Sequence, residues 1–498
     1  MNRPGGDWVE CCAPTRRRLP LRMLSCMGMA LAAACQPPPE GPPDVAMVDA
    51  GPSFDLHLSD LAPAVDIASL DQWQPDLPAP DLLSDDEPFA TQRAACAFKA
   101  GATTAETFGP SIANTAIPID TFVILVKENR SFDHYYSSLP AYGQPDVDAA
   151  SPTASNPDSM GNPVSRLHAP ALCIGVGDIE HSWSQMHADW NNGAMDGFVK
   201  VNGNSDVMQY FTDADLPFYY AMANTFAIAD HYFAPVLGPT GPNRYFLYAG
   251  TAAGIIDNRT TIDQSLPNLF DALSNAKVDW TVYAGGAASF EAGAYPHQVM
   301  LHPDRFRSLK DFQDAAMQGR LPSVVFLRMN CSDEHPDDDV QVGQRNTEKV
   351  YNLLRMSPQW MRTALFVTHD EGGGFYDHVP PPPACAPDST APKLQPGDNA
   401  PGDFAQLGFR VPMIVVSPWS RPHFVAHTTF DHTSLLRLLE LRFSLPAFTA
   451  RDANATTLLE MFDFSAPRCA NVPMLPPAII EKARSCNLRD GSCVDPPL

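Results

Sequence analysis

Short apolar runs recur along the chain from about residue 120 onward, and each is the length of a buried strand. Runs of this kind that are bounded by polar residues are typical of strands covered on both faces, as in parallel sheets. Four are rich in β-branched and aromatic residues: Thr121–Val126, Ser323–Leu327, Thr363–Thr368 and Val411–Val416. We therefore predict that these four segments are buried strands of a mostly parallel sheet.

Helical periodicity appears between these runs. Residues 346–356 place Val350, Leu353 and Leu354 on one face, and residues 433–443 are largely apolar. Strands that alternate with helices predict an α/β protein. No linker-like break occurs between residues 91 and 498, so we interpret this part of the chain as one large domain.

The first 35 residues resemble an export signal. Arg16–Arg18 precede an apolar stretch that ends in Leu31-Ala-Ala-Ala-Cys35. Small residues followed by Cys resemble a bacterial lipobox, in which the Cys becomes lipidated. The alternative is an ordinary cleaved signal with a chance Cys. The sequence therefore predicts an exported protein, either a surface or outer-membrane lipoprotein anchored through Cys35, or a periplasmic or secreted one.

Residues 36–90 have the composition of a disordered tether. They hold eleven prolines and twelve acidic residues but no Lys or Arg. Such a segment buries too little apolar surface to fold, and its charge keeps it extended. We predict no helix in it.

The composition excludes some functions. Lys and Arg number 33 against 57 Asp and Glu, a net charge of -24. Nucleic-acid binding is therefore not expected, because phosphate backbones need clustered positive charge. A site that handles phosphate on so acidic a protein is expected to recruit a cation.

The chain has 11 cysteines, of which seven follow Cys35. None forms a CxxC pair, so we expect no zinc site built on such pairs. Export permits disulfides. Cys486 and Cys493 are close enough in sequence to pair locally, and the odd number leaves at least one thiol free or paired elsewhere.

Polar clusters follow three of the predicted strands. Glu128 and Asn129 come after the first, His335 after the second, and Asp370 and Glu371 after the third. Ligands of open α/β sheets bind beyond the carboxyl ends of the strands. Oxygen ligands without paired Cys suit a divalent cation such as Mg²⁺, Mn²⁺ or Ca²⁺. The alternative is that each acid caps a helix or faces water.

A further cluster surrounds a hydroxyl. Thr240 lies within Gly238-Pro-Thr-Gly-Pro-Asn-Arg244, just before a helical pattern that starts at Tyr245. A hydroxyl near a helix N-terminus meets a positive dipole and free N–H groups, which suits a phosphate. Arg244 either binds phosphate oxygens or pairs internally. The alternative for Thr240 is that it only caps the helix.

Together these motifs resemble the bacterial phosphoesterase family, which includes phosphatidylcholine-hydrolysing phospholipases C and an acid phosphatase. The matching segments run in family order from about residue 118 to 445: Glu128–His134, Glu180–Trp183, Gly193–Phe198, Gly238–Arg244, Asp370–Val379 and Asp431–Ser434. The resemblance implies an alkaline-phosphatase-like three-layer sandwich, with a central mostly parallel sheet and helices on both faces.

The resemblance also implies an activity, phosphoric-ester hydrolysis through a phospho-Thr intermediate, with a phosphate ester or phospholipid as substrate. Thr240 matches the family's nucleophile, and His181 and His335 match histidines around the phosphate. The positions that match ligands of a divalent metal are Glu128, Asn129, Asp370 and Glu371.

Some features depart from the family pattern and leave the substrate open between monoester and diester. His369 stands where an aromatic residue is expected, and Gly374 adds a third glycine. His378 and His432 are either part of the site or structural. Rival hypotheses are a sulfatase-like hydrolase, which the absence of a Cys/Ser-x-Pro-x-Arg motif disfavours, and a surface lipoprotein that only binds.

Overall fold

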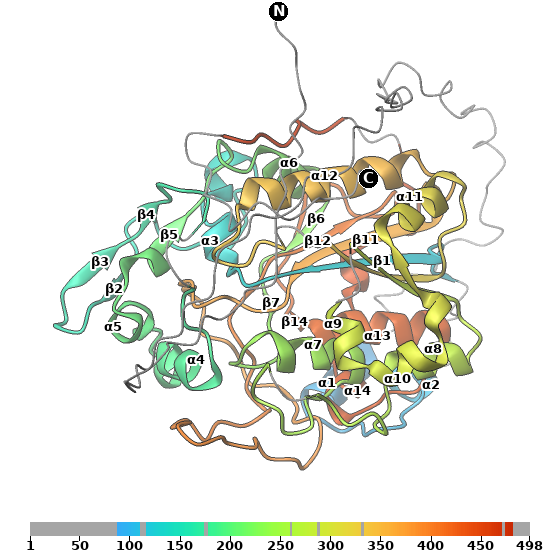
Figure 1. Cartoon of the computed structure of the whole chain (residues 1–498), viewed down its shortest axis with the longest axis horizontal. Coiled ribbons are helices and arrows are strands. Elements are labelled where there is room, and N and C mark those ends of the chain that lie inside the picture. The colour runs from blue at the N-terminus through green and yellow to red at the C-terminus, as the bar shows by residue number, and fades with distance from the viewer. Residues whose placement is uncertain are drawn as a thin grey trace, which may run out of the picture. The chain divides into compact units, whose positions relative to one another are not determined.

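A central sheet organises the part of the chain that the computed structural model describes, which is residues 87–109, 116–173, 178–258, 261–285, 289–329, 333–470 and 474–481. It has eight strands in the order β13-β6-β12-β11-β1-β10-β8-β9 (Figure 1). The strands are β1 (Thr121–Lys127), β6 (Ala227–Ala229), β8 (Trp280–Ala284), β9 (Phe306–Ser308), β10 (Val324–Arg328), β11 (Thr363–His369), β12 (Met413–Val416) and β13 (Phe424–Ala426).

Most neighbouring strands run parallel. β1 lies between β10 and β11 and is parallel to both, and the β10–β8 and β8–β9 pairs are parallel too. β12, by contrast, is antiparallel to β11 and β6. The sequence predicted a parallel strand at Val411–Val416, which is wrong in direction. A parallel neighbour requires a crossover, usually a helix, and the described connection 370–412 contains no helix.

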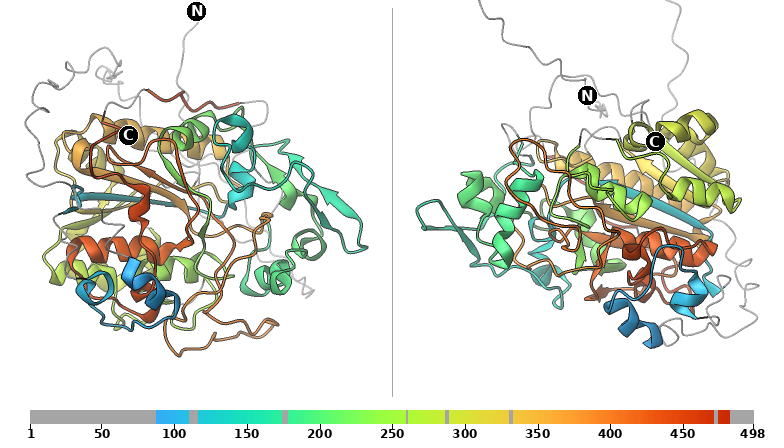
Figure 2. Two further views of the ribbon diagram at one scale, coloured as in Figure 1. Left: turned by 180° about the vertical axis from the view of Figure 1, so that it is seen from behind. Right: turned by 90° about the horizontal axis from the view of Figure 1, so that it is seen from below.

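Helices cover both faces of the sheet (Figures 1 and 2). Phe122, Ile124 and Val126 of β1 face one hydrophobic core, which they share with α7 (Thr240–Ala249), α8 (Leu269–Asn275) and α13 (His432–Phe443). Val123 and Leu125 face the other, shared with α6 (Pro217–Thr225), α11 (Leu309–Met317) and α12 (Val340–Met356). The strand therefore alternates its side chains between two cores, and the predicted α/β three-layer architecture is confirmed.

Two predicted helices begin earlier than their periodicity indicated. α12 starts at Val340 rather than at residue 346, because Asp339 caps it by accepting a hydrogen bond from Gln341 N–H. α13 starts at His432 and is capped by Asp431. The sequence predicted no helix in residues 36–90. The structure has a helix, α1, at Glu87–Ala94, so this prediction is wrong for residues 87–90.

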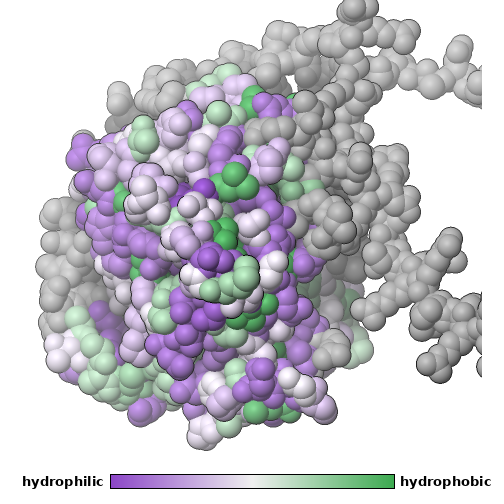
Figure 3. Space-filling model, turned by 90° about the vertical axis from the view of Figure 1, so that its left-hand side faces the viewer, coloured by the Kyte–Doolittle hydropathy of each residue, from purple (hydrophilic) through white to green (hydrophobic). Residues whose placement is uncertain are grey.

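A smaller lobe lies beside the sheet, to the left in Figure 1. It holds the hairpin of β2 (Ser155–Pro157) and β3 (Pro163–Ser165), the paired β4 (Leu167–His168) and β5 (Gln209–Tyr210), and the helices α4 (Trp183–Trp190) and α5 (Phe198–Asn202). Its outward face is mainly hydrophilic with small separate hydrophobic patches (Figure 3).

The remaining elements are short. They are α2 (Thr104–Phe108), α3 (Phe132–Tyr136), α9 (Phe290–Ala294), α10 (Pro296–Leu301), α14 (Ala450–Ala453), β7 (Tyr232–Phe233) and β14 (Phe430–Asp431), with several single turns of 3₁₀ helix. None of the described helices is long and apolar enough to cross a membrane.

A disulfide joins Cys96 to Cys385 across 289 positions of sequence, and Cys173 is disulfide-bonded as well. Cys469 is buried and carries a free thiol. The export signal, most of the tether and the proposed pair of Cys486 and Cys493 lie outside the described residues.

Candidate active site

The carboxyl ends of β1 and β11 bring the first and third polar clusters together. The two strands are in register up to Lys127 and His369, so the residues that follow emerge side by side. Asp370 N–H donates to the Lys127 carbonyl at 3.1 Å, and Asp370 Oδ1 accepts from Asn129 N–H at 3.3 Å. The first and third polar clusters therefore share one edge of the sheet.

Thr240 is the first residue of α7 and faces Asn129. Pro239 is the N-cap residue of α7, and its side chain makes no capping hydrogen bond. The Thr240 hydroxyl donates instead to Asn129 Oδ1 at 3.3 Å. The alternative that Thr240 is only an N-cap is therefore wrong. This hydroxyl lies at the positive end of a ten-residue helix.

His181 approaches Asn129 from the other side. Its Nδ1 donates to the Ile179 carbonyl at 2.6 Å, which assigns the ring proton to Nδ1 and leaves Nε2 as an acceptor. The amide nitrogen of Asn129 lies 3.1 Å from that Nε2. Asn129 thus bridges His181 and Thr240 through the two ends of one carboxamide.

Glu371 provides a buried oxygen without a hydrogen bond. Its side chain is fully buried; Oε2 accepts from Gly373 N–H at 2.6 Å, but Oε1 has no hydrogen-bond partner and lies 3.5 Å from His181 Nε2. Burial and the neighbouring charge of Asp370 raise the pKa of Glu371 well above its usual value. A carboxylate oxygen in such surroundings fits a cation ligand.

The other two acids already have cationic partners. Asp370 Oδ2 pairs with Arg244 Nε at 2.7 Å, and Glu128 Oε1 lies 3.3 Å from Arg244 and 3.0 Å from Arg328. Burial would raise the pKa of Glu128, but the two guanidinium groups lower it to about 2. Arg244 therefore pairs internally, which was one of its two predicted roles. Arg328 was not predicted; its position at the end of β10 was the available signal.

His335 lies beside a carboxylate that the sequence analysis missed. His335 Nε2 is 3.5 Å from Asp178 Oδ2, and its Nδ1 is 2.8 Å from Asp337. Asp178, His181 and His335 each offer a possible metal-ligand atom, and these atoms lie within 4.8 Å of one another. Asp178 precedes α4, two residues before the Glu180–Trp183 segment, and its proximity to His335 appears only in the three-dimensional structure.

The charge of His335 follows from these neighbours. Burial alone would lower its pKa. The hydrogen bond to Asp337 and the negative charge of Asp178 outweigh burial, and with a contribution from Glu128 they raise the pKa to about 9. His335 is therefore an imidazolium at neutral pH and can donate a proton.

The two histidines of undecided role are bound to other groups. His432 Nε2 lies 2.9 Å from the Asp370 carbonyl, and its Nδ1 lies 3.0 Å from the Tyr232 hydroxyl. His378 Nδ1 pairs with Asp133 at 2.7 Å, in a network with Asp377 and Arg410. His432 thus supports the backbone of Asp370, and His378 belongs to a separate ionic cluster.

A cavity of about 340 Å³ opens beside the N-terminus of α7. Pro239, His181 and Asn258 line it, together with four acids: Asp178, Glu180, Asp257 and Asp398. No Lys or Arg is among its described lining residues. These acids disfavour additional negative charge in the cavity and favour neutral or cationic groups.

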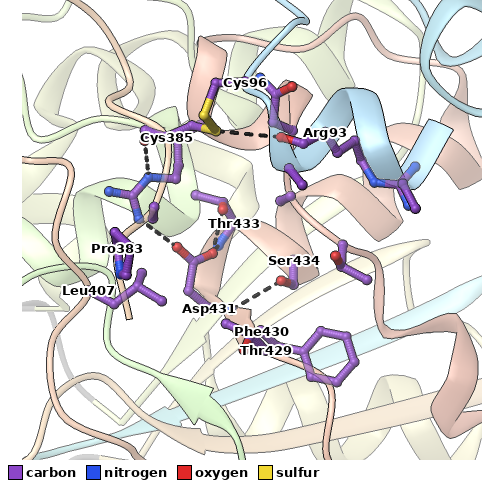
Figure 4. Close-up of a pocket in the computed structure, with 17 residues that line it drawn as sticks. Arg93, Cys96, Pro383, Cys385, Leu407, Thr429, Phe430, Asp431, Thr433 and Ser434 are labelled. Atoms are coloured by element: carbon purple, nitrogen blue, oxygen red, sulfur yellow. Dashed lines mark hydrogen bonds and ion pairs between the residues drawn. A yellow bond between two sulfur atoms is a disulfide. The ribbon is translucent and has the colours of Figure 1, made fainter. Parts of the chain in front are cut away.

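A second cavity, of about 370 Å³, lies elsewhere (Figure 4). The Cys96–Cys385 disulfide forms part of its wall, and Asp431 and Arg451, which also line it, are paired with each other at 2.9 Å. It contains none of the predicted catalytic or metal-binding residues. We therefore place the candidate active site beside the first cavity, which is lined by His181 and by Pro239, the residue before Thr240.

Comparison with known proteins decides the family, since residues 119–446 match the Phosphoesterase family. The chain belongs to this family. Phospholipase C B of Mycobacterium tuberculosis (strain ATCC 25618 / H37Rv) is 34% identical over 421 residues, which are 72% of this chain and 80% of that protein. Non-specific phospholipase C1 of Arabidopsis thaliana is 32% identical over 386 residues, covering 69% and 71%. This phosphoesterase is thus a hydrolase that acts on phosphoric esters.

Other comparisons are more distant or cover less. Non-hemolytic phospholipase C of Burkholderia pseudomallei is 30% identical over 468 residues, 76% of this chain but only 65% of that protein. Among solved structures, a protein in the alkaline phosphatase superfamily from Vibrio parahaemolyticus is 10% identical with a TM-score of 0.32, covering 65% of this chain and 77% of that chain.

Proposed function

We propose that this phosphoesterase is a phospholipase C-like phosphodiesterase in which Thr240 is the nucleophile and a divalent cation assists. The observation that carries the proposal is the position of the Thr240 hydroxyl at the start of α7, bonded to Asn129 at the edge where Glu128, Asp370 and Glu371 gather. Relatives named phospholipase C, at 30–34% identity, favour a diester over a monoester.

The cation would be held by Glu371 together with Glu128, Asn129 and Asp370. The unpartnered Oε1 of Glu371 supports this assignment more strongly than Glu128 and Asp370 do, because Arg244 contacts both of those carboxylates. When bound, such an ion lowers the pKa of a nearby hydroxyl and offsets charge on phosphate oxygens.

The residues of the chain account for the remaining steps. Thr240 Oγ1 attacks phosphorus and releases its hydroxyl proton to solvent, the bond to the leaving alcohol breaks, and the phosphoryl group stays on Thr240 with its other ester. Thr240 regains a proton from solvent when water later cleaves that ester. His335, charged at neutral pH, gives its proton to the leaving oxygen. Neutral His335 then takes a proton from the water that releases Thr240. His181 keeps the carboxamide of Asn129 oriented toward the Thr240 hydroxyl.

The acidic lining favours one class of substrate. A headgroup that remains on phosphorus would face Glu180, Asp257 and Asp398, so a neutral or cationic alcohol such as choline fits better than an anionic one. A phosphomonoester, the substrate of an acid phosphatase, would bring a second negative charge next to these acids, so a monoester fits this site less well than a diester.

The test compares three substrates on the purified protein: a chromogenic phosphomonoester, a phosphodiester and a phosphorylcholine ester. We expect turnover of the phosphorylcholine ester to exceed that of the monoester, and to be lost after chelation and restored by a divalent ion. Thr240→Ala should lower kcat by at least about 10³-fold without loss of folding, and Thr240→Ser should keep substantial activity. A Thr240→Ala protein with one tenth of the wild-type rate would show that Thr240 is not the nucleophile.

A further inference from the structure

The N-terminus of α7 is capped by a residue from another segment. The first N–H groups of a helix lack partners within it, and Pro239 at the N-cap has no side chain that accepts a hydrogen bond. Gly241 N–H donates to Asn258 Oδ1 at 2.7 Å. Asn258 therefore supplies, from seventeen positions beyond Gly241, the acceptor that an N-cap residue usually provides.

Close backbone packing keeps Asn258 beside the nucleophile. A Cβ atom on Gly241 would lie 3.0 Å from the Asp257 carbonyl oxygen and 3.1 Å from Asn258 Oδ1. A larger residue at position 241 would require the 257–258 segment to shift by a few tenths of an ångström. Since Gly241 directly follows Thr240, the carboxamide of Asn258 is held at the same end of α7 as the Thr240 hydroxyl.

The other end of that carboxamide is unused. Among the described residues no group accepts a hydrogen bond from Asn258 Nδ2, and the side chain is exposed and lines the 340 Å³ cavity with Pro239 and His181. The hydrogen bond from Gly241 to Oδ1 polarises the amide and makes its N–H groups better donors. The result is a neutral donor at the wall of the cavity, next to the predicted nucleophile.

We propose that Asn258 is a catalytic residue whose Nδ2–H donates to a non-bridging oxygen of the phosphoryl group being transferred to Thr240. This inference rests on the function proposed above. Charge on the phosphoryl oxygens changes during transfer, and a donor already in place stabilises it without reorganisation. Arg244 and Arg328 are paired with Asp370 and Glu128, and although Arg244 Nη1 has no hydrogen-bond partner, neither arginine lines the cavity. Asn258 therefore adds a neutral donor from another segment on the cavity side.

Two substitutions separate this role from helix capping. Asn258→Asp keeps an oxygen that accepts from Gly241 N–H but removes the donor, whereas Asn258→Ala removes both. We expect both variants to lose about 10²–10³-fold in kcat/KM for the phosphorylcholine ester and to be inhibited more weakly by inorganic phosphate. Only Asn258→Ala should also have a lower Tm, because it leaves Gly241 N–H without its acceptor.

A matched control is Asn204→Asp. Asn204 accepts from Asp206 N–H at the start of a short turn and does not line the cavity, so this variant should keep wild-type kinetics. If Asn258→Asp stays within threefold of wild-type kcat/KM, Asn258 is a helix cap only and the inference fails. If Asn258→Asp does not fold, the inference fails when Asn258→Ala keeps near-normal kcat/KM and near-normal inhibition by phosphate. Activity of Thr240→Ala would instead refute the proposed function itself.

Discussion

Asn129 occupies the centre of the candidate site although its backbone is unfavourable for an asparagine. Its φ of 58° lies in the left-handed region, which asparagine tolerates better than most residues. This conformation lets one carboxamide contact both Thr240 and His181. A backbone outlier held at a reaction centre is consistent with a functional constraint.

Much of the site could be predicted at the scale of single residues. Glu128, Asn129, Asp370 and Glu371 follow strands, and the parallel alignment of those strands brings them to one place. Arg328 also stands at the end of a predicted strand and was missed, whereas Asp178 and Asn258 could not be predicted in this way. Asp178 and Asn258 lie in irregular connections, and the partners that define their roles are distant in sequence.

The raised pKa of His335 predicts a pH dependence. His335 is protonated below a pKa of about 9, so its proton is available at neutral pH and is lost as the pH rises through 9. We expect kcat/KM for a phosphodiester with an alkyl leaving group to fall above about pH 9. His335→Gln should have a lower kcat/KM at neutral pH and should not show this fall. A nitrophenyl leaving group, which needs no proton, should be much less sensitive to His335→Gln. Equal losses with both substrates would contradict proton donation by His335.

At the scale of elements, the alternation of strands and helices predicted the layers, but strand direction could not be predicted for β12. An apolar run of this kind indicates that the strand is buried on both faces, but it does not indicate whether the strand runs parallel or antiparallel to its neighbours. Direction depends on whether the preceding connection crosses the sheet, and residues 370–412 do not form a crossover helix. The start of α12 was missed for a similar reason, because a polar stretch with Gly343 precedes its periodic part.

The turn after β11 presents a test at this scale. Gly373 has a φ of 63°, and a Cβ atom there would lie 2.2 Å from the Asn129 carbonyl oxygen. Gly203 has the same φ and open space around it. Both alanine substitutions incur the backbone cost of about 1 kcal/mol, but only Gly373→Ala displaces Asn129. We expect Gly373→Ala to lose at least about tenfold in kcat and more stability than Gly203→Ala, which should keep normal kinetics. Similar kinetics in the two variants would show that the placement of Asn129 does not matter for turnover.

At the scale of the whole molecule, the disulfide and the charge both bear on location. The disulfide between Cys96 and Cys385 is typical of proteins that fold in an oxidising compartment. It supports the proposal that the chain is exported; attachment through a lipid on Cys35 is a separate proposal that rests on the sequence around that residue. A net charge of -24 would repel an anionic membrane surface, so a long acidic tether and an anchor would together allow the enzyme to work near a membrane without adhering to it.

Cell fractionation tests this proposal. Wild-type protein should sediment with membranes, and Cys35→Ser should move to the soluble exported fraction, because the acyl chains supply the binding energy. Cys469→Ala, which changes a cysteine with no role in anchoring, should fractionate like wild type. If wild type and Cys35→Ser are equally soluble, the lipoprotein proposal fails and secretion without an anchor replaces it.

The central claim is that Thr240 carries the phosphoryl group during turnover. The most direct measurement mixes the enzyme with a phosphorylcholine ester, stops the reaction in acid within its first turnovers, and examines the peptide containing residue 240 by mass spectrometry. We predict a fraction of that peptide bearing phosphorylcholine on Thr240, which rises before steady state and is absent from Thr240→Ala. An unmodified peptide at every time point, while product accumulates at the wild-type rate, would contradict the covalent mechanism.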